Sequence, residues 1–417
     1  MRKHKTLLSI AAPLALYWSA GHILAQGERA PHHERREQPQ AAAQLNEFLE
    51  TLWPLANEKG IARPLFDAAL ADLEPDPSVI AAAEKQAEFE RPLKAYLAEA
   101  VSARRIARGR ATLHAHKAEL AEISNRYGVP APVIVAAFGL ESDYGSATGG
   151  KNIIRSLATL AFVRRDRPEF RAELVDALWV MQKSGLSRAA LKGSWAGAMG
   201  GPQFLPSAYL RYAVSYRRDG PPDIWTKPLD ILASIANFLR QSGWQPGLPW
   251  GLEVILPDDF PFASLHQSFA AFEAQGVKAA NGESFPQGDA TVFLPSGARG
   301  PAFLLSANYW VLKAYNNSDS YALSLALLAD RIEGKGALHG HWPENELFLP
   351  RAEKSEIQRL LAALGLYRGT IDGRFGQASR DAIHDFQIRT GVFPADGFAA
   401  PGLLNRLNDE VRRNAGQ

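Results

Sequence analysis

The stretch VPAPVIVAAFGLESDYG, residues 129–145, predicts a short helix that is followed directly by glycine. Pro130 and Pro132 stand at the first turn, where a helix tolerates proline because the missing N–H has no partner there anyway. Gly145 is expected to end the helix about three turns later. The remaining residues of the stretch are mostly apolar, so the helix is expected to bury at least one face.

Glu141 is the candidate catalytic residue of this helix. Ile134, Phe138 and Glu141 have the spacing of one helix face, so the acid continues an apolar stripe. A carboxyl group held against apolar neighbours has a raised pKa, because burial disfavours the charged form, and such an acid can donate a proton in catalysis. The alternative is a glutamate that faces solvent at the helix end or pairs with an arginine.

Composition excludes several classes of protein. The chain has 417 residues, of which 46% are hydrophobic and 22% are charged, so two to three globular domains are expected. The 46 basic residues nearly balance the 44 acidic ones, so the overall charge gives no indication of nucleic-acid binding. The absence of cysteine excludes disulfides, thiolate metal sites, a cysteine nucleophile and a lipidated N-terminal cysteine.

The N-terminus has the pattern of a signal peptide over residues 1–25. Arg2, Lys3 and Lys5 precede an apolar core over 7–16, and Ala25 ends a candidate cleavage site. An uncleaved signal anchor is the alternative, and export to the periplasm without a lipid anchor is expected in either case. Residues 26–44 are polar and are predicted to form a flexible tether.

The fold class predicted from periodicity is mainly α. Helical spacing of apolar residues begins at Leu45 and extends through a large domain over 45–334, with a small β patch at 252–256 and 290–294. From Phe303 to Ile332 the pattern is expected to return to helix. Residues 335–350 resemble a linker, and 351–410 are predicted to form a separate small module.

Residues 191–209, LKGSWAGAMGGPQFLPSAY, form a second distinctive stretch. Four glycines and the polar residues Ser194 and Gln203 favour a loop whose backbone lies close to a ligand. The stretch lacks the Gly-Lys-Ser/Thr ending of a phosphate-binding loop. A packing turn without a ligand is the alternative.

Taken together, these motifs resemble the lytic murein transglycosylase B family, glycoside hydrolase family 103, over roughly residues 45–333. The resemblance implies a lysozyme-like catalytic domain with an additional helical subdomain. The module over residues 357–407 resembles the helical peptidoglycan-binding domain, which implies three helices. The residues that carry both resemblances are Glu141–Gly145, Gly193–Gly200, Pro202–Ser207, Asp223–Trp225, Ser234–Asn237, Tyr315, Asn316, Tyr321, Gly365, Asp372–Gly376, Phe386, Gln387, Asp396 and Gly397.

The family resemblance implies cleavage of the β-1,4 bond between N-acetylmuramic acid and N-acetylglucosamine, with a 1,6-anhydro ring at the product end. It implies that Glu141 acts first as general acid and then as general base, assisted by the acetamido group of the substrate. The spacing of the residues is consistent with this, because Asp143 lies about 200° around the helix from Glu141 and cannot easily share its site.

By the same resemblance Ser194, Gln203, Tyr315, Asn316 and Tyr321 are expected to line the sugar cleft, where hydroxyl, amide and aromatic groups suit a glycan. Peptidoglycan glycan strands are the expected partner, with no nucleic acid, and a monomer is expected. Two alternatives are a muramidase that uses water on the same fold and a non-catalytic wall-binding protein.

No cofactor and no metal are predicted. Some members of the family have a calcium-binding loop after the glycine-rich motif, and the corresponding residues here are 215–223. Two arginines and two prolines occupy much of this loop, and Asp219, Asp223 and Asp230 are the acids available. Because calcium prefers several oxygen ligands at alternating positions, this loop is not expected to bind it.

Overall fold

The computed structural model describes residues 34–85, 92–344 and 349–415. The predicted signal peptide and residues 26–33 lie outside this part of the chain. The described residues divide into two compact units. We call residues 34–85 and 104–242 the glutamate unit, and residues 92–103 and 243–415 the sheet unit. Within the described ranges, no helix combines the length and the apolar character that crossing a bilayer requires.

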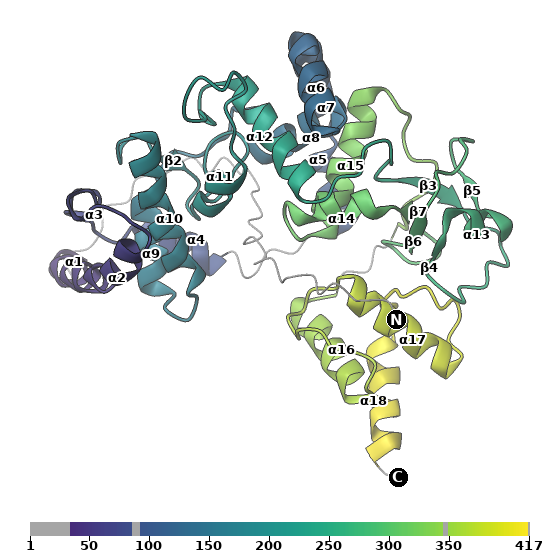
Figure 1. The fold of residues 1–417 in the computed structure, drawn as a ribbon. Helices are drawn as coiled ribbons and strands as arrows, with labels where there is room; N and C mark the ends of the chain where they lie inside the picture. The colour runs from purple at the N-terminus through teal and green to yellow at the C-terminus, as the bar shows by residue number, and fades with distance from the viewer. Residues whose placement is uncertain (1–33, 86–91, 345–348, 416–417) are drawn as a thin grey trace, which may run out of the picture. The chain divides into compact units, whose positions relative to one another are not determined.

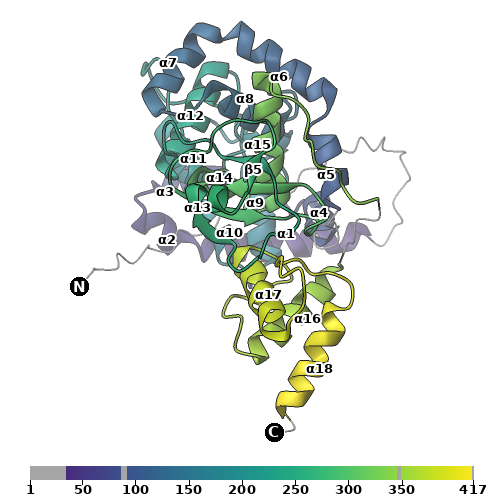
Figure 2. The same cartoon turned by 90° about the vertical axis from the view of Figure 1, so that its right-hand side faces the viewer.

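The glutamate unit is almost entirely helical (Figure 1). Helix α8, which carries Glu141, packs against α7 and α12, and α10 packs against α9 and α11 (Figure 2). Two short strands, β1 and β2, pair antiparallel. The elements are α1 (Glu34–Glu50), α2 (Trp53–Glu58), α3 (Arg63–Leu70), α4 (Pro77–Lys85), α6 (Ala103–Ala115), α7 (Lys117–Tyr127), α8 (Ala131–Ser142), β1 (Lys151–Asn152), α9 (Ile153–Val163), α10 (Glu169–Ser184), β2 (Lys192–Gly193), α11 (Pro206–Tyr212) and α12 (Pro228–Gln241).

Helix α1 corrects the predicted tether. It begins at Glu34, so residues 34–44 are helical rather than flexible. The run of glutamine and alanine over 40–44 consists of good helix formers, and Leu45 and Leu49 bury the end of the helix. The polar composition alone therefore gave a wrong prediction for these residues.

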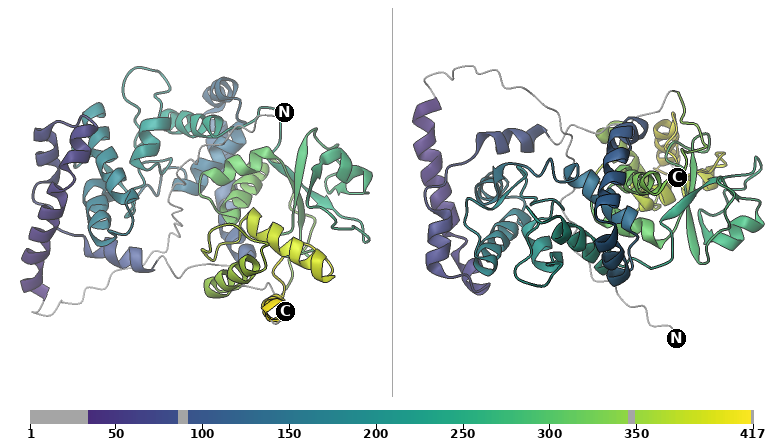
Figure 3. Two further views of the ribbon diagram at one scale, coloured as in Figure 1. Left: turned by 60° about the horizontal axis from the view of Figure 1, so that its bottom comes forward. Right: turned by 90° about the horizontal axis from the view of Figure 1, so that it is seen from above.

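The sheet unit contains a five-stranded antiparallel sheet with the order β4-β6-β7-β3-β5, which lies beside α14 and α15 (Figure 3). The predicted β patch is confirmed as β3 and β6. Residues 303–305, predicted to begin a helix, instead belong to strand β7, because a buried apolar run of four residues has no periodicity that separates strand from helix. The elements are α5 (Leu93–Ala100), β3 (Gly251–Ile255), β4 (His266–Ser268), α13 (Phe269–Ala274), β5 (Lys278–Ala279), β6 (Asp289–Phe293), β7 (Ala302–Leu305), α14 (Ala307–Ala314) and α15 (Asp319–Glu333).

Three further helices of this unit form the predicted C-terminal module, which we define as residues 351–415: α16 (Arg351–Ala363), α17 (Gln377–Thr390) and α18 (Leu403–Ala415). Its two Asp-Gly turns are held in the same way by buried glutamines. Gln358 Oε1 accepts the backbone N–H of Gly373 at 2.8 Å, and Gln387 Oε1 accepts that of Gly397 at 2.8 Å. The turns that mark this module in the sequence therefore serve its folding.

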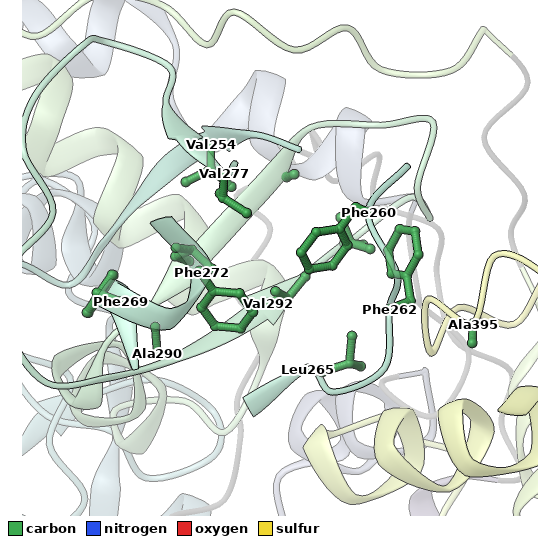
Figure 4. Packing of buried hydrophobic residues seen from close by; sticks show 13 residues of the cluster. Val254, Phe260, Phe262, Leu265, Phe269, Phe272, Val277, Ala290, Val292 and Ala395 are labelled. Atoms are coloured by element: carbon green, nitrogen blue, oxygen red, sulfur yellow. The ribbon is translucent and has the colours of Figure 1, made fainter. Parts of the chain in front are cut away.

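The C-terminal module packs against the sheet region. Ala395 belongs to the same buried cluster as Phe260, Phe262 and Leu265 (Figure 4). The buried ring of His384 on α17 contacts the carbonyl oxygen of Phe262 at 2.8 Å. These contacts fix the module to the sheet region, although the sequence predicted only a linker between them.

One contact of this interface is titratable, because His266 Nε2 on β4 lies 2.9 Å from a carboxylate oxygen of Asp381 on α17. The hydrogen bond to Asp381 raises the pKa of His266 above 6.5, although burial opposes this. Burial would raise the pKa of Asp381, but hydrogen bonds from His266 and Gln377 and the charges of His266 and His384 lower it below 3.8. The ion pair is therefore strongest at mildly acidic pH.

We expect the His266–Asp381 pair to make the protein more stable at pH 6 than at pH 8. The raised pKa of His266 adds stability that is present below pH 6.5 and is lost as the pH rises through the raised value. The lowered pKa of Asp381 adds stability above pH 3.8 that is lost only at lower pH. The contribution should be below about 1 kcal/mol, because both side chains are partly exposed. Urea unfolding of the wild type and of His266→Gln at both pH values measures it, and an equal pH dependence of the two proteins would contradict the prediction.

Candidate functional site

Helix α8 holds Glu141 near its C-terminal end. Pro130 is the N-cap residue and Pro132 lies in the first turn, as predicted. Every residue from Val133 to Gly139 is buried, so the helix is buried on all sides rather than along one stripe. Glu141 itself is half-buried. The predicted apolar stripe is therefore replaced by an apolar helix whose middle is buried on all sides and whose first and last turns are partly exposed. Glu141 lies in the last turn.

The helix ends two residues after Glu141, at Asp143 rather than at Gly145. Asp143 and Tyr144 both adopt left-handed backbone conformations, with φ of 47° and 56°. The Tyr144 hydroxyl donates to the carbonyl oxygen of Arg105 at 2.7 Å, and burial raises the pKa of this tyrosine. Aspartate tolerates this conformation better than most residues, which explains why the helix ends before the glycine.

Asp143 is engaged by arginines of α6. Its carboxylate forms an ion pair with Arg108, and Arg104 and Arg105 approach it to 3.7 and 3.9 Å. Arg108 also donates to the backbone carbonyl of Asp143 at 2.8 Å. These contacts hold the Asp143 carboxylate at the end of the helix. The acid nearest to Glu141 in the sequence therefore has a structural role.

Ser142 connects the end of α8 to the glycine-rich loop over residues 193–204. Its buried hydroxyl donates to the carbonyl oxygen of Gly201 at 2.7 Å and accepts the backbone N–H of Gly145 at 3.1 Å. Because Ser142 directly follows Glu141, these bonds fix the position of the acid relative to the loop.

Ser194 and Gln203 hold this loop in shape. The Ser194 hydroxyl accepts the backbone N–H of Ala198 at 3.0 Å, and the side chain is buried. Gln203 has a left-handed backbone with φ of 52°, and its amide nitrogen donates to the carbonyl oxygens of Thr148 at 3.0 Å and Gly200 at 2.8 Å. Contact of these two residues with a sugar stays a prediction. In Gln203 the amide oxygen would make this contact, because the amide nitrogen already donates to two carbonyl oxygens.

The other three predicted residues lie in the sheet unit. Tyr315 and Asn316 directly follow α14, and Tyr321 lies in the first turn of α15. The rings of Tyr315 and Tyr321 are stacked, with centroids 6.1 Å apart and an interplanar angle of 25°. Asn316 is 8% exposed, and its side-chain Oδ1 has no hydrogen-bond partner in the described structure. A buried acceptor without a donor is unfavourable, so it marks a position where a ligand could supply the donor.

The prediction thus divides between the two units. Glu141, Ser194 and Gln203 belong to the glutamate unit, where Ser142 joins the acid to the loop. Tyr315, Asn316 and Tyr321 belong to the sheet unit.

Glu173 on α10 was not predicted from the sequence, and this residue supports the start of α11. Its carboxylate accepts the backbone N–H of Ser207 at 3.0 Å and the Ser207 hydroxyl at 2.6 Å. Burial raises the pKa of Glu173, although these hydrogen bonds oppose the shift. The glutamate lies on the buried part of a long helix, and this break in the apolar pattern is the signal that could have identified it.

The acids of the loop over 215–230 are already hydrogen-bonded. Asp230 is buried and accepts the backbone N–H groups of Tyr216 at 2.8 Å and Asp223 at 2.9 Å, and Asp223 accepts those of Trp225 and Thr226. No group of three or more histidines or acids within the described ranges is arranged to hold a metal ion. The absence of calcium binding at this loop stays a prediction, which these hydrogen bonds support.

Comparison with known proteins gives matches over both parts of the chain. Residues 44–330 match the family model of the transglycosylase SLT domain, and residues 351–407 match that of a peptidoglycan binding domain. The chain is 32% identical over 212 residues to membrane-bound lytic murein transglycosylase B of Escherichia coli strain K12, which covers 49% of this chain and 58% of that protein. The chain thus matches little more than half the length of this curated relative.

Two solved structures extend the comparison. SltB3 from Pseudomonas aeruginosa, in complex with NAG-NAM-pentapeptide, is similar with a TM-score of 0.79 and 42% identity, over 87% of this chain and 99% of that chain. Lytic transglycosylase Slt35 of Escherichia coli, in complex with calcium, is similar with a TM-score of 0.59 and 25% identity, over 70% of this chain and 92% of that chain.

We expect Gly193→Ala to destabilise the protein by about 1–3 kcal/mol, as overpacking does. A Cβ atom at Gly193 would overlap the carbonyl oxygen of Ala198, and backbone cannot move aside easily. Gly150→Ala is the matched control, because a Cβ there meets nothing within 4 Å, and it should change stability by less than about 0.5 kcal/mol. Urea unfolding measures both, and equal stabilities of the two variants would contradict the prediction.

We also expect the loop over 215–230 to bind no calcium at micromolar concentration, because its carboxylates accept backbone N–H groups and Arg217 and Arg218 add positive charge. Calorimetric titration of the protein, stripped with chelator, tests this. A micromolar dissociation constant that is lost in Asp223→Asn would overturn it.

Proposed function

Because the chain belongs to the transglycosylase SLT family, we propose that it is a lytic murein transglycosylase that cleaves the glycan strands of peptidoglycan. The bond cleaved joins N-acetylmuramic acid to N-acetylglucosamine through a β-1,4 linkage, and the muramic acid product ends in a 1,6-anhydro ring. The observation that carries this proposal is the half-buried Glu141 in the last turn of a helix whose middle is buried, two residues before Asp143, which forms an ion pair with Arg108.

In the proposed reaction Glu141 performs both proton transfers. The carboxylic acid first donates its proton to the glycosidic oxygen, and the bond from this oxygen to C1 of the muramic acid breaks. The substrate's acetamido group stabilises the resulting cation. The carboxylate then takes the proton of the C6 hydroxyl as that oxygen forms a bond to C1, so the acid is regenerated and no water is consumed.

The environment of Asp143 supports a mechanism with one acid. Glycosidases that use water or a covalent intermediate need two carboxyl groups on opposite sides of the bond. Asp143 is ion-paired with Arg108 and lies at the helix end in a fixed conformation, so it is unsuited to the second role. Substrate assistance removes the need for that second carboxyl.

We propose that the predicted residues of each unit contribute to sugar binding. The unpartnered Oδ1 of Asn316 would accept a hydrogen bond from an N-acetyl N–H or a sugar hydroxyl, and the stacked rings of Tyr315 and Tyr321 offer an apolar face to a pyranose. Ser194 and Gln203 would act chiefly by keeping the glycine-rich loop open to the strand.

The C-terminal module is proposed to bind the cell wall, as its family match suggests. The enzyme would act in the periplasm, where peptidoglycan is accessible, after export through the segment over residues 1–25. It would act there as a monomer, because a glycan strand needs a single acid for both steps.

A muramidase on the same fold is the second candidate, because the Glu141 carboxylate, once it has donated its proton, could take a proton from water instead of from the C6 hydroxyl. Mass spectrometry of digested sacculi separates the two reactions. The proposed transglycosylase should release fragments with anhydro ends, which lack one water relative to the reducing ends that a muramidase leaves. Reducing ends as the main product would overturn the proposal.

We expect Glu141→Gln to bind sacculi as the wild type does but to lose turnover by at least about a thousandfold, because the amide cannot donate or accept the proton. Release of soluble fragments measures turnover, and pelleting with sacculi measures binding.

The matched control is Glu119→Gln, which removes a half-buried carboxylate in the first turn of the neighbouring helix α7. It should cleave at the wild-type rate. Wild-type turnover by Glu141→Gln would exclude Glu141 as the acid, and lost turnover without retained binding would point to misfolding instead.

A further inference from the structure

A buried cluster of three charges links the C-terminal module to the segment that carries the predicted sugar-binding tyrosines. Asp319, the first residue of α15, forms ion pairs with Lys313 of α14 at 2.8 Å and with Arg380 of α17 at 2.7 Å. We call residues 315–321 the tyrosine loop. We propose that Arg380 is a positioning residue of this enzyme, which acts through Asp319 to fix the tyrosine loop for the glycan.

The three charged side chains are well shielded from water. The exposed fractions are 11% for Asp319, 12% for Lys313 and 18% for Arg380. Burial alone would raise the pKa of Asp319, but the charges and hydrogen bonds of Arg380 and Lys313 lower it. The Tyr309 hydroxyl also lies 3.4 Å from Asp319 Oδ1. Asp319 is therefore ionised and held from three sides, which is how a buried charge becomes stable.

The cluster controls the shape of the tyrosine loop because it ties the end of α14 to the start of α15. Lys313 lies in the last turn of α14, and Asp319 opens α15, so their ion pair spans the residues between them. Asn317 in the middle has a left-handed backbone with φ of 49°, a conformation that surrounding contacts must enforce. Ser318 accepts the backbone N–H of Tyr321, which ties the tyrosine to the same helix start.

Arg380 itself is fixed by the docking of the module. Its guanidinium lies 4.7 Å from the ring centre of Phe293, which is buried in β6. Asp396 of the module also accepts the backbone N–H of Ala298 at 3.0 Å, and His384 contacts the Phe262 carbonyl. The guanidinium of Arg380 is therefore brought to Asp319 by a module that other contacts also hold against the sheet region.

This assignment gives the C-terminal module a second role. A module on a free tether could be deleted without effect on the cleavage of short soluble fragments. Here its removal would take away one of the two cations at Asp319 and would also remove Ala395, which helps to bury Phe262. We infer that the catalytic part depends on the module even for substrates too small to reach a distant binding site. The inference rests on the proposed function, in which the tyrosine loop binds sugar.

The experiment compares Arg380→Met, Arg380→Lys and the control Arg389→Met in the full chain. Arg389 lies on the same helix but is exposed. With a soluble NAG-NAM-peptide oligomer as substrate, Arg380→Met should raise KM about tenfold and leave kcat within about twofold, because contacts that bind substrate and transition state equally are lost. Arg380→Lys should recover at least part of this loss, and Arg389→Met should match the wild type.

Binding in a background without turnover separates this inference from the proposed function. Calorimetry should show the oligomer bound about tenfold more weakly by Glu141→Gln with Arg380→Met than by Glu141→Gln alone, whatever product the active enzyme releases. Pelleting with sacculi should be unchanged, which shows that the module is folded.

Three results would overturn the inference. The first is an unchanged KM and affinity in Arg380→Met, and the second is an equal effect of Arg389→Met. The third is a fall in kcat alone together with lower thermal stability, which is the result expected for a purely structural residue. Asp319→Asn provides an independent check. Its effect on affinity should not add to that of Arg380→Met, since both remove the same ion pair, and full additivity would also count against the inference.

Discussion

The hydrogen bond from Ser142 to the carbonyl oxygen of Gly201 joins the two segments on which the catalytic half of the site depends. One segment is an apolar helix whose residues 133–139 are all buried. The other is a loop of glycines whose backbone lies too close to its neighbours for side chains at Gly193 or Gly200. Because the bond begins at the residue after Glu141, small shifts of the loop would move the acid as well.

The charge distribution around the helix end gives its two acids different roles. Three arginines of α6 approach the Asp143 carboxylate and hold it at the helix end. Glu141, two residues earlier in the chain, is half-buried in the last turn of α8. A half-buried carboxyl group suits the proton transfers proposed for Glu141.

Ion pairs also connect the parts of the sheet unit. Asp319 receives one cation from its own helical hairpin and one from the C-terminal module. The module is thus part of the same packed body as the sheet, with Ala395 in its apolar cluster and His384 bonded to its backbone. A wall-binding module attached in this way would hold the glycan and the tyrosine loop in one fixed arrangement, rather than simply raising the local concentration of substrate.

The sequence by itself determined the helix around Glu141, the glycine-rich loop, the β patch and the three-helix module, since each depends on turn residues and on apolar spacing between near neighbours in the chain. It was wrong about residues 34–44 and 303–305, because neither polar composition nor a short apolar run determines the local conformation there. Only the tertiary structure decided that Asp143 meets arginines 35 to 39 positions away, that Gln203 bonds to Thr148, and that Arg380 reaches Asp319. Ion pairs and buried polar contacts of this kind join segments far apart in the chain. The pattern of residues within one segment does not say which distant charged or polar residue the fold will place beside it.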